Sequence, residues 1–291
     1  MARVLITGTS SGIGLATAVA FAEAGHKVYA TMRNPIRALE LGHRPASEAL
    51  PITVTTMDVD SDESVKVAID GIVNEGGAID VLVNNAGIER SGSVEELPLA
   101  EFRAVMETNY FGALRCIKGV LPAMRKRRNG CIVNIASVAG RIACSPLAPY
   151  TASKFALEAL SESLAQEMKP FNVRVAIVEP GIIDTPMARR IENPQNPSQY
   201  PQQRRFGAMF TASLKNPVSP SLVAAKVVEI VDSGTWRLRH PVGPDAEGFL
   251  GWREAMGDEE WVDWGALDDD AWYDRLKADF GMDARPGDEQ H

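Results

Sequence analysis

The segment Val-Leu-Ile-Thr-Gly-Thr-Ser-Ser-Gly-Ile-Gly, residues 4–14, joins a short apolar run to a turn rich in glycine. Glycines at positions 8, 12 and 14 permit a positive φ and a close approach of the backbone to a ligand. The amphipathic residues 12–25 predict a helix, whose free N–H groups and partial positive charge favour a pyrophosphate. The turn alone is compatible with a purely structural role, but its place between a strand and a helix favours binding.

The rhythm of the first 180 residues indicates the fold class. Short β-branched runs alternate with longer amphipathic segments, and the runs are nearly continuous in apolar residues, as in strands covered on both faces. The predicted strands are Val4–Thr7, Lys27–Thr31, Ile52–Met57, Val81–Asn84, Cys131–Ala136 and Arg174–Val178. The predicted helices cover residues 12–25, 61–76, 98–127 and 149–169. This alternation predicts an α/β, Rossmann-like, doubly wound parallel sheet in three layers, α/β/α, within a single domain.

Composition limits the other classes. A chain of 291 residues that is 45% hydrophobic suffices for one large core. The net charge of −8 argues against nucleic acid as a partner. No apolar run is long enough for a membrane span, and no secretory signal precedes the first strand, so a cytoplasmic protein is expected. The three cysteines and four histidines lack the spacing of metal ligands, so no metal site is expected.

Two later segments depart from this rhythm. Residues 186–220 are rich in Pro, Gln and Asn and predict a long functional loop. A helix at about 220–233 and a strand at about 236–240 follow. The tail, residues 241–291, is acidic but carries four of the five tryptophans, which argues against simple disorder. We therefore divide the chain into a binding and catalytic domain, 1–240, and an extension, 241–291, packed on that domain or at a subunit interface.

The end of the second predicted strand bears on the choice of cofactor. An acidic residue there would bind the ribose 2′-hydroxyl of NAD, but Met32 and Arg33 follow this strand. A guanidinium pairs well with a 2′-phosphate, and Ser10 in the glycine turn adds a hydroxyl. Arg33 as a solvated surface charge is the competing interpretation, so the residues favour NADP(H) and leave NAD(H) as the alternative.

Two more segments follow predicted strands. Asp58-Val59 ends the third strand, where it can bind the adenine amino group, and Asn84-Asn-Ala-Gly87 ends the fourth. Loops at the carboxyl ends of parallel strands form the ligand crevice of such sheets. Taken alone, the second segment is also an ordinary Asn/Gly turn.

Tyr150-Thr-Ala-Ser-Lys154 begins a predicted helix. Spacing by four places Tyr150 and Lys154 on one face, one turn apart, so the ammonium is expected to lower the tyrosine pKa and to favour proton transfer near neutral pH. Ser137 follows the strand Cys131–Ala136, where its hydroxyl can orient a substrate oxygen. A lone Tyr-x-x-x-Lys is more often structural, and the combination carries the argument.

Two further segments belong with these motifs, namely Asn109 and Pro180-Gly-Ile-Ile-Asp-Thr185. Together, in order and spacing, they resemble the single-domain branch of the short-chain dehydrogenase/reductase family. The resemblance covers residue 3 to about 240. The resemblance implies that Asn109, Ser137, Tyr150 and Lys154 are catalytic, with Asn109 holding a water in a proton relay. Thr185 would contact the nicotinamide carboxamide, and 186–220 would form a substrate lid. Implied cofactor contacts are Gly8, Ser10, Ser11, Gly12, Ile13, Gly14, Arg33, Asp58, Val59, Asn85, Ala86, Gly87, Tyr150, Lys154, Pro180, Gly181, Ile183 and Thr185.

The implied reaction is hydride transfer between NADP(H) and a secondary alcohol or ketone. The segment 28–34 and the length look like the 17β-hydroxysteroid and retinol dehydrogenase-like branch. Lid residues Met187, Tyr200, Phe206, Met209 and Phe210, with Ile88, Ile142 and Leu147 opposite, suggest an apolar or ring-containing substrate, or merely lid packing. Glu89, Arg190, Arg204 and Arg205 are candidates for polar substrate groups or solvated charges.

Two other functions stay open at this level: a non-catalytic NADP(H)-binding regulator, and an epimerase or dehydratase of the longer family branch. The first typically lacks the Tyr or the Lys, and the second has a different glycine spacing. By analogy with the family, a homodimer or homotetramer is expected through the helices 98–127 and 149–169.

Overall fold

The structure, a computed structural model, describes residues 1–37, 50–192 and 198–286. Within these residues seven strands form one parallel sheet in the order β3-β2-β1-β4-β5-β6-β7. The strands are β1 (Arg3–Thr7), β2 (Lys27–Met32), β3 (Ile52–Thr56), β4 (Val81–Asn84), β5 (Gly130–Ile135), β6 (Val173–Pro180) and β7 (Arg239–Val242). The predicted doubly wound parallel sheet is confirmed, with its switch point between β1 and β4.

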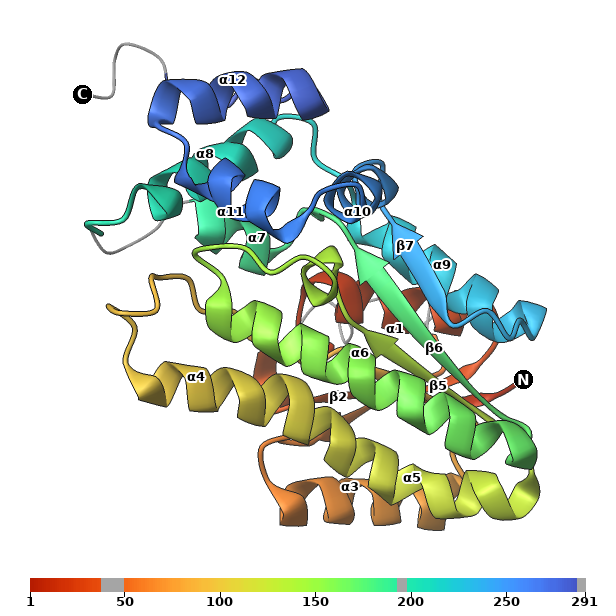
Figure 1. The fold of residues 1–291 in the computed structure, drawn as a ribbon. Coiled ribbons are helices and arrows are strands. Elements are labelled where there is room, and N and C mark those ends of the chain that lie inside the picture. The colour runs from red at the N-terminus through yellow and green to blue at the C-terminus, as the bar shows by residue number, and fades with distance from the viewer. Residues whose placement is uncertain (38–49, 193–197, 287–291) are drawn as a thin grey trace.

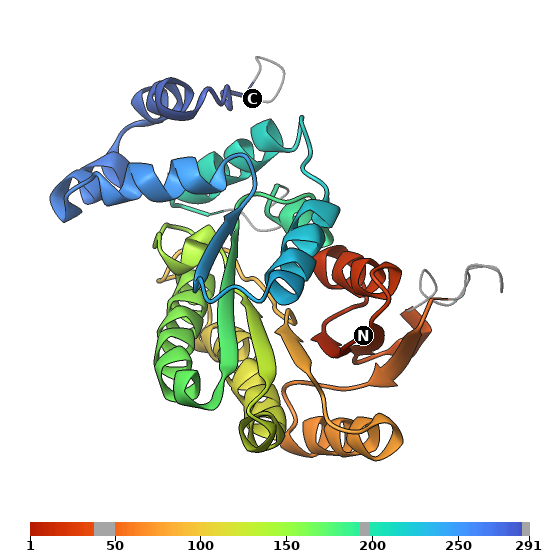
Figure 2. The same cartoon turned by 90° about the vertical axis from the view of Figure 1, so that its right-hand side faces the viewer.

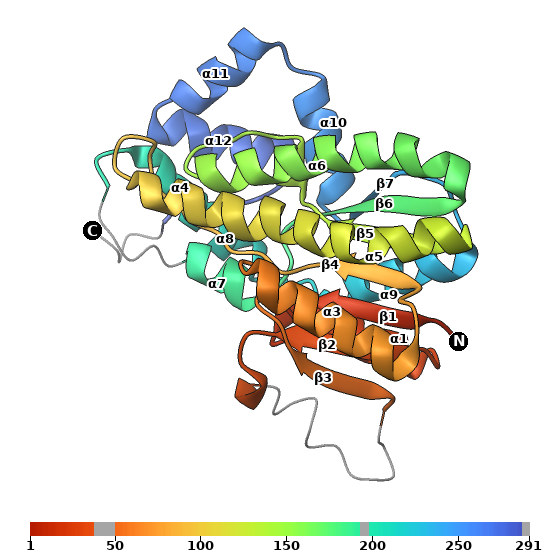
Figure 3. The same cartoon turned by 90° about the horizontal axis from the view of Figure 1, so that it is seen from below.

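Helices cover both faces of the sheet (Figures 1 and 3). α1 (Gly12–Glu23) and α9 (Pro220–Ser233) pack on one face, and α3 (Asp62–Gly76), α5 (Ala113–Arg127) and α6 (Ala148–Met168) on the other. Because the strand pleat alternates, Val4 and Ile6 join the core beneath α1, and Leu5 joins the opposite core. Short 3₁₀ segments are η1 (Pro35–Arg37), η4 (Val138–Gly140) and η5 (Lys169–Phe171).

The single helix predicted over 98–127 is interrupted. α4 (Leu99–Met106) passes into a π-helical segment, η3 (Glu107–Gly112), before α5 begins. Asn109 lies in this segment. π-Helical turns inside longer helices occur frequently at functional sites, because the extra residue re-aims a side chain.

The prediction of a long loop over 186–220 is wrong for the residues that the structure describes. They contain α7 (Pro186–Glu192) and α8 (Pro201–Ser213), while 193–197 lie outside the described residues. Pro186 and Pro201 each stand at the start of a helix, where a missing N–H has no intrahelical partner to lose. These prolines therefore begin helices, although in the sequence they read as loop residues.

The tail forms α10 (Ala246–Glu254), α11 (Asp258–Ala266) and α12 (Asp269–Phe280), and its residues 287–291 lie outside the described range. Figures 1 and 2 show these blue helices beside α8, at the end of the molecule remote from α3. Trp272, Tyr273 and Leu276 of α12 form a small core with Met209 of α8. The tail thus packs against α8. None of the described helices is long and apolar enough to cross a membrane.

Candidate active site

A cavity of about 500 Å³ lies at the carboxyl ends of the central strands and gathers most of the predicted site residues. Its lining includes Ser11, Gly12, Ile13, Gly14, Asn85, Gly87, Ser137, Tyr150, Lys154, Pro180, Gly181, Ile183 and Thr185. Gly8, Ser10, Arg33, Asp58, Val59, Ala86 and Asn109 do not line it. The structure therefore brings the glycine turn and the Ser, Tyr and Lys into one cavity, and leaves the residues after β2 and β3 outside.

The glycine turn packs directly against the turn after β4. Gly8 has a φ of +70°, and a Cβ there would lie 2.7 Å from the Cα of Ala86. A Cβ on Gly14 would lie 2.4 Å from the carbonyl oxygen of Gly8. The side-chain Nδ2 of Asn85 donates to the carbonyls of Thr7 and Gly8 at 2.9 and 3.1 Å. Glycine is needed here because the two backbones leave no space for a side chain.

The ends of β2 and β3 flank this turn. The N–H of Thr9 donates to the carbonyl of Thr31 at 3.1 Å, which holds the turn against the end of β2, and Arg33 follows with an exposed side chain. Asp58 Oδ1 accepts the backbone N–H two residues later at 3.2 Å, and Val59 is buried. The guanidinium of Arg33 acts on the nearby Asp60, where its charge opposes the rise in the pKa of that carboxyl that burial causes.

Asn109 is a buried connector rather than a cavity residue. Its Oδ1 accepts the backbone N–H of Ile88 at 2.8 Å, and its Nδ2 donates to the carbonyl of Ile88 and to Ser153 Oγ, both at 2.9 Å. The Ser153 hydroxyl donates to the carbonyl of Tyr150 at 2.7 Å. The π-helical segment thus ties the loop after β4 to the first turn of α6.

Ser137, Tyr150 and Lys154 come from two adjoining elements. Ser137 follows β5 and caps η4, where its Oγ accepts the N–H of Ala139 at 3.1 Å and also hydrogen-bonds Tyr150. Lys154 lies one turn after Tyr150 in α6, with Nζ 5.5 Å from the centre of the Tyr150 ring. Lys154 Nζ donates to the carbonyl of Ile135 at 2.8 Å. This hydrogen bond holds the ammonium at the end of β5, where both residues line the cavity.

The expected lowering of the tyrosine pKa is not what the structure gives. Burial raises the pKa of Tyr150 to about 12, with Glu89 acting in the same direction and the Ser137 hydrogen bond opposing it. Burial also lowers the pKa of Lys154 to about 8, against the carboxylate of Glu158. Desolvation disfavours the charged form of each group, so both neutral forms gain.

A buried ionic cluster behind Lys154 escaped the sequence analysis. Glu158 lies one turn after Lys154, and its Oε2 accepts from Arg239 Nε at 2.9 Å. Glu179 of β6 is fully buried, 3.6 Å from both Arg239 and Arg141. Burial and the neighbouring Glu179 raise the pKa of Glu158 to about 7. The Lys-x-x-x-Glu spacing is visible in the sequence, but its burial depends on β6 and β7.

Lid and tail form the apolar wall of the cavity. Among the predicted substrate residues, Met187, Phe206, Met209, Phe210, Ile142 and Leu147 line it, whereas Ile88 and Tyr200 do not. The tail adds residues that the sequence could not place, namely Phe249, Trp252, Trp261, Trp264, Trp272 and Phe280. The rings of Trp261 and Trp264 stack at 5.5 Å, and Trp261 Nε1 donates to the carbonyl of Ala143 at 3.2 Å. That bond joins α11 to the loop that follows Ser137.

The charged residues considered as partners of polar substrate groups differ in their exposure and in whether they line the cavity. Arg205 is buried and lines the cavity, Arg190 is exposed and lines it, and Arg204 is exposed and does not. Glu89 is buried outside the lining, and burial raises its pKa. The expectation of solvated charges therefore fails for Arg205 and Glu89, because neighbouring elements enclose them.

Comparison with known proteins agrees with this geometry. The sequence pattern of the short chain dehydrogenase family matches residues 2–196. The chain is 36% identical over 248 residues to a 3-ketodihydrosphingosine reductase of Bacteroides thetaiotaomicron, covering 83% of this chain and 87% of that protein. It is 39% identical over 256 residues to retinol dehydrogenase 8 of Bos taurus, covering 81% and 80%.

The fold has close counterparts among solved structures. An actinorhodin polyketide ketoreductase with NADPH superimposes with a TM-score of 0.74 at 31% identity, covering 86% of this chain and 97% of that chain. The family pattern spans the glycine turn, Asn109, Ser137, Tyr150 and Lys154, and extends through the start of the lid. This chain belongs to the short-chain dehydrogenase family of oxidoreductases.

Proposed function

We propose that the protein is an NADP(H)-dependent oxidoreductase that transfers hydride between the nicotinamide and a secondary alcohol or ketone, with Tyr150 as acid and base. The convergence of Ser137, Tyr150 and Lys154 on the cavity that also receives the glycine turn carries this proposal. The apolar wall supports a large apolar or ring-containing substrate. The names of two relatives, a 3-ketodihydrosphingosine reductase and a retinol dehydrogenase, support the same class.

The chain's residues fit a dinucleotide. A Cβ would fill the cradle at Gly8 and Gly14, so the turn offers backbone alone. Ser11 is the N-cap of α1 but makes no side-chain cap, which leaves N–H groups of the first turn for a pyrophosphate. Arg33 would pair with a 2′-phosphate at the edge beyond β2. When bound there, NADP(H) would supply or accept the hydride.

The phenol of Tyr150 carries its proton at neutral pH, because burial raises its pKa to about 12. It is therefore prepared to donate a hydrogen bond, and then the proton, to a substrate oxygen. Ser137, hydrogen-bonded to that phenol, would hold the same oxygen in line. The buried Lys154 would favour negative charge developing on the phenol oxygen.

Asn109 would act as a positioning residue. Its amide fixes the backbone of Ile88 and, through Ser153, the carbonyl of Tyr150. We retain the proposal that it also holds a water in a relay from Lys154. A proton taken from Tyr150 would then be replaced through that relay.

The pH dependence of ketone reduction should report Lys154. Activity is expected to fall as pH rises through about 8, where its ammonium is lost. In Glu158→Gln the falling limb should move to lower pH, because the carboxylate that raises the pKa of Lys154 is gone. Glu162→Gln is the matched control, since it also pairs with Arg239 but does not act on Lys154. Measured kcat/KM profiles that coincide for wild type and Glu158→Gln would contradict the assignment.

Arg33→Asp should raise the KM for NADPH by roughly tenfold or more, because a charge-assisted contact is replaced by repulsion. The KM for NADH should stay the same or fall, and Arg33→Lys should lie between. Initial rates with both cofactors at a fixed ketone concentration give these values. An unchanged KM for NADPH in Arg33→Asp would show that Arg33 is only a solvated charge.

The reaction class itself is tested with the purified protein, NADPH and a panel of apolar ketones, by the loss of NADPH absorbance. Oxidation of NADPH by at least one ketone, with formation of the alcohol, is expected. Tight NADPH binding without turnover of any ketone or alcohol would favour the non-catalytic regulator instead.

We further propose a homodimer or homotetramer formed through α4, α5 and α6. Phe111 in η3, between α4 and α5, and Phe155 in α6 are exposed, at 43% and 41% of their surface. Light scattering coupled to gel filtration measures the mass directly. A monomer at micromolar concentration would reject the proposal.

A further inference from the structure

The charged side chains that line the cavity, among the described residues, all have one sign. In the described part of the chain, the charged residues that line it are Lys154, Arg190 and Arg205, and no acidic residue is among them. The whole protein has a net charge of −8. Lys154 belongs to the catalytic end, whereas Arg190 and Arg205 come from the lid helices α7 and α8. A basic interior in an acidic protein indicates that the lid end receives an anion.

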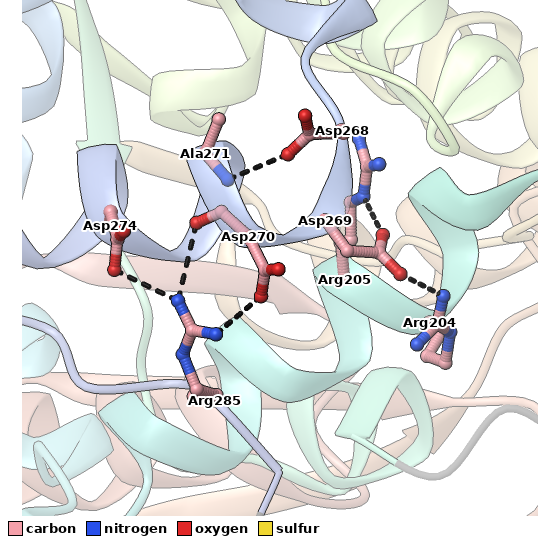
Figure 4. A network of polar contacts seen from close by, with 8 residues as sticks. All are labelled: Arg204, Arg205, Asp268, Asp269, Asp270, Ala271, Asp274 and Arg285. Atoms are coloured by element: carbon pink, nitrogen blue, oxygen red, sulfur yellow. Dashed lines mark hydrogen bonds and ion pairs between the residues drawn. The ribbon is translucent and has the colours of Figure 1, made fainter.

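Arg205 is the buried member of this set, with only 4% of its surface exposed. Its Nε donates to Asp269 Oδ1 at 2.6 Å, and Arg204 donates to the other oxygen of the same carboxylate (Figure 4). One carboxylate is thus shared by two guanidinium groups, of which only Arg205 is buried. Arg205 Nη1 is buried and has no hydrogen-bond partner among the residues that the structure describes. A buried donor without a partner destabilises the fold, more so when it is charged, and a ligand that accepts from it would remove that cost.

Two neighbours share this property. Trp264 Nε1 in α11 and Gln202 Oε1, one turn before Arg205 in α8, are also buried without a partner in the described part of the chain, and both residues line the cavity. Gln202 Nε2 donates to the carbonyl of Gly265 at 3.3 Å, which places α8 and the end of α11 together. Arg205 and Trp264 offer donors only, whereas the N–H group of the Gln202 amide is already used by Gly265. Residues with buried donors on two helices, α8 and α11, therefore belong to the lining of the same cavity.

We propose that this end, formed by α8, α11 and α12, binds a carboxylate at the far end of an apolar substrate whose ketone or alcohol lies at Tyr150. The inference rests on the proposed function for the position of the reacting group. The carboxylate would accept from Arg205 and Trp264, and the tryptophan rings would enclose the apolar part. The substrate class is therefore an apolar keto acid or hydroxy acid, with the two polar groups at opposite ends.

Binding of a long-chain keto acid and of its methyl ester tests this without turnover. Tryptophan fluorescence is the readout, because four tryptophans line the cavity. Wild type should bind the acid roughly tenfold or more tightly than the ester, as expected for a charge-assisted hydrogen bond. Arg205→Met should bring the ratio of the two dissociation constants near one. Arg204→Met is the matched control: it shares Asp269 but does not line the cavity, and it should keep the preference.

Trp264→Phe provides a second variant that keeps the ring and removes the donor, so it should also reduce the preference. Equal binding of acid and ester by wild type would overturn the proposal. So would equal loss of preference in Arg205→Met and Arg204→Met, since Arg205 would then only anchor α12 through Asp269. NADPH turnover of neutral ketones is measured separately: failure there removes the proposed function, whereas failure of the acid preference alone leaves it intact.

Discussion

Replacing Tyr150 with Phe is expected to lower kcat/KM for ketone reduction by about 10²–10⁴-fold, the range typical of a lost general acid. The phenol is the group beside Ser137 that holds a proton at neutral pH, because burial raises its pKa to about 12. Phenylalanine preserves the ring and removes only the hydroxyl. NADPH affinity, measured by fluorescence titration, should stay within about twofold, since the glycine turn is untouched.

The matched control is Tyr110→Phe. Tyr110 lies in the π-helical segment, packs edge-on against Phe111 and does not line the cavity. The same chemical change there should leave kcat/KM within about twofold. A Tyr150→Phe protein that reduces ketones at the wild-type rate would show that another group supplies the proton.

Gly14→Ala is expected to damage cofactor binding and stability together. The new methyl group would lie 2.4 Å from the Gly8 carbonyl oxygen and 2.4 Å from Asn85 Nδ2. The first of these is backbone, so the turn itself must move. Overpacking of this kind costs about 1–3 kcal/mol of unfolding free energy. The Kd for NADPH should rise by at least roughly tenfold, because the first turn of α1 shifts away from its ligand position.

Gly71→Ala is the control for a helical glycine. Gly71 lies in α3, and a Cβ there meets nothing within 4 Å. It should be neutral or stabilising by up to about 1 kcal/mol, since alanine is the better helix former. Thermal unfolding with and without NADPH distinguishes the two variants. If Gly14→Ala matched Gly71→Ala in both measurements, the close packing of the two turns would not be a requirement for binding.

Local patterns predicted the strands of the sheet well. They failed at prolines, because a proline occurs both in loops and at the first position of a helix. Each apolar run corresponds to a strand, because a parallel strand buried on both faces needs little more than apolar, β-branched residues. Pro186 and Pro201 suggested a loop, yet each begins a helix. A proline at the first helical position and a proline in a loop look alike until the following residues find something to pack against.

The electrostatics of the site depend on burial, which no local pattern reports. Tyr150 and Lys154 lie one turn apart as predicted, but desolvation raises the pKa of the first to about 12 and lowers that of the second to about 8. The spacing of four predicted only an attraction between the phenolate of Tyr150 and the ammonium of Lys154. Glu158 follows Lys154 in α6, and β6 places Glu179 near Glu158, so both carboxyl groups lie behind Lys154.

The sequence by itself determined the parallel sheet, the glycine turn and the Ser, Tyr and Lys at their family spacing, because these follow from short-range periodicity and fixed motifs. Only the tertiary structure decided how the tail is used. Its tryptophans are more than 100 residues from Ser137 in the chain, and they line the cavity because α12 packs on α8 and α11 bonds to Ala143. Contacts of that sequence separation depend on the whole fold, so the wall that the tail adds to the cavity could not be read from the sequence.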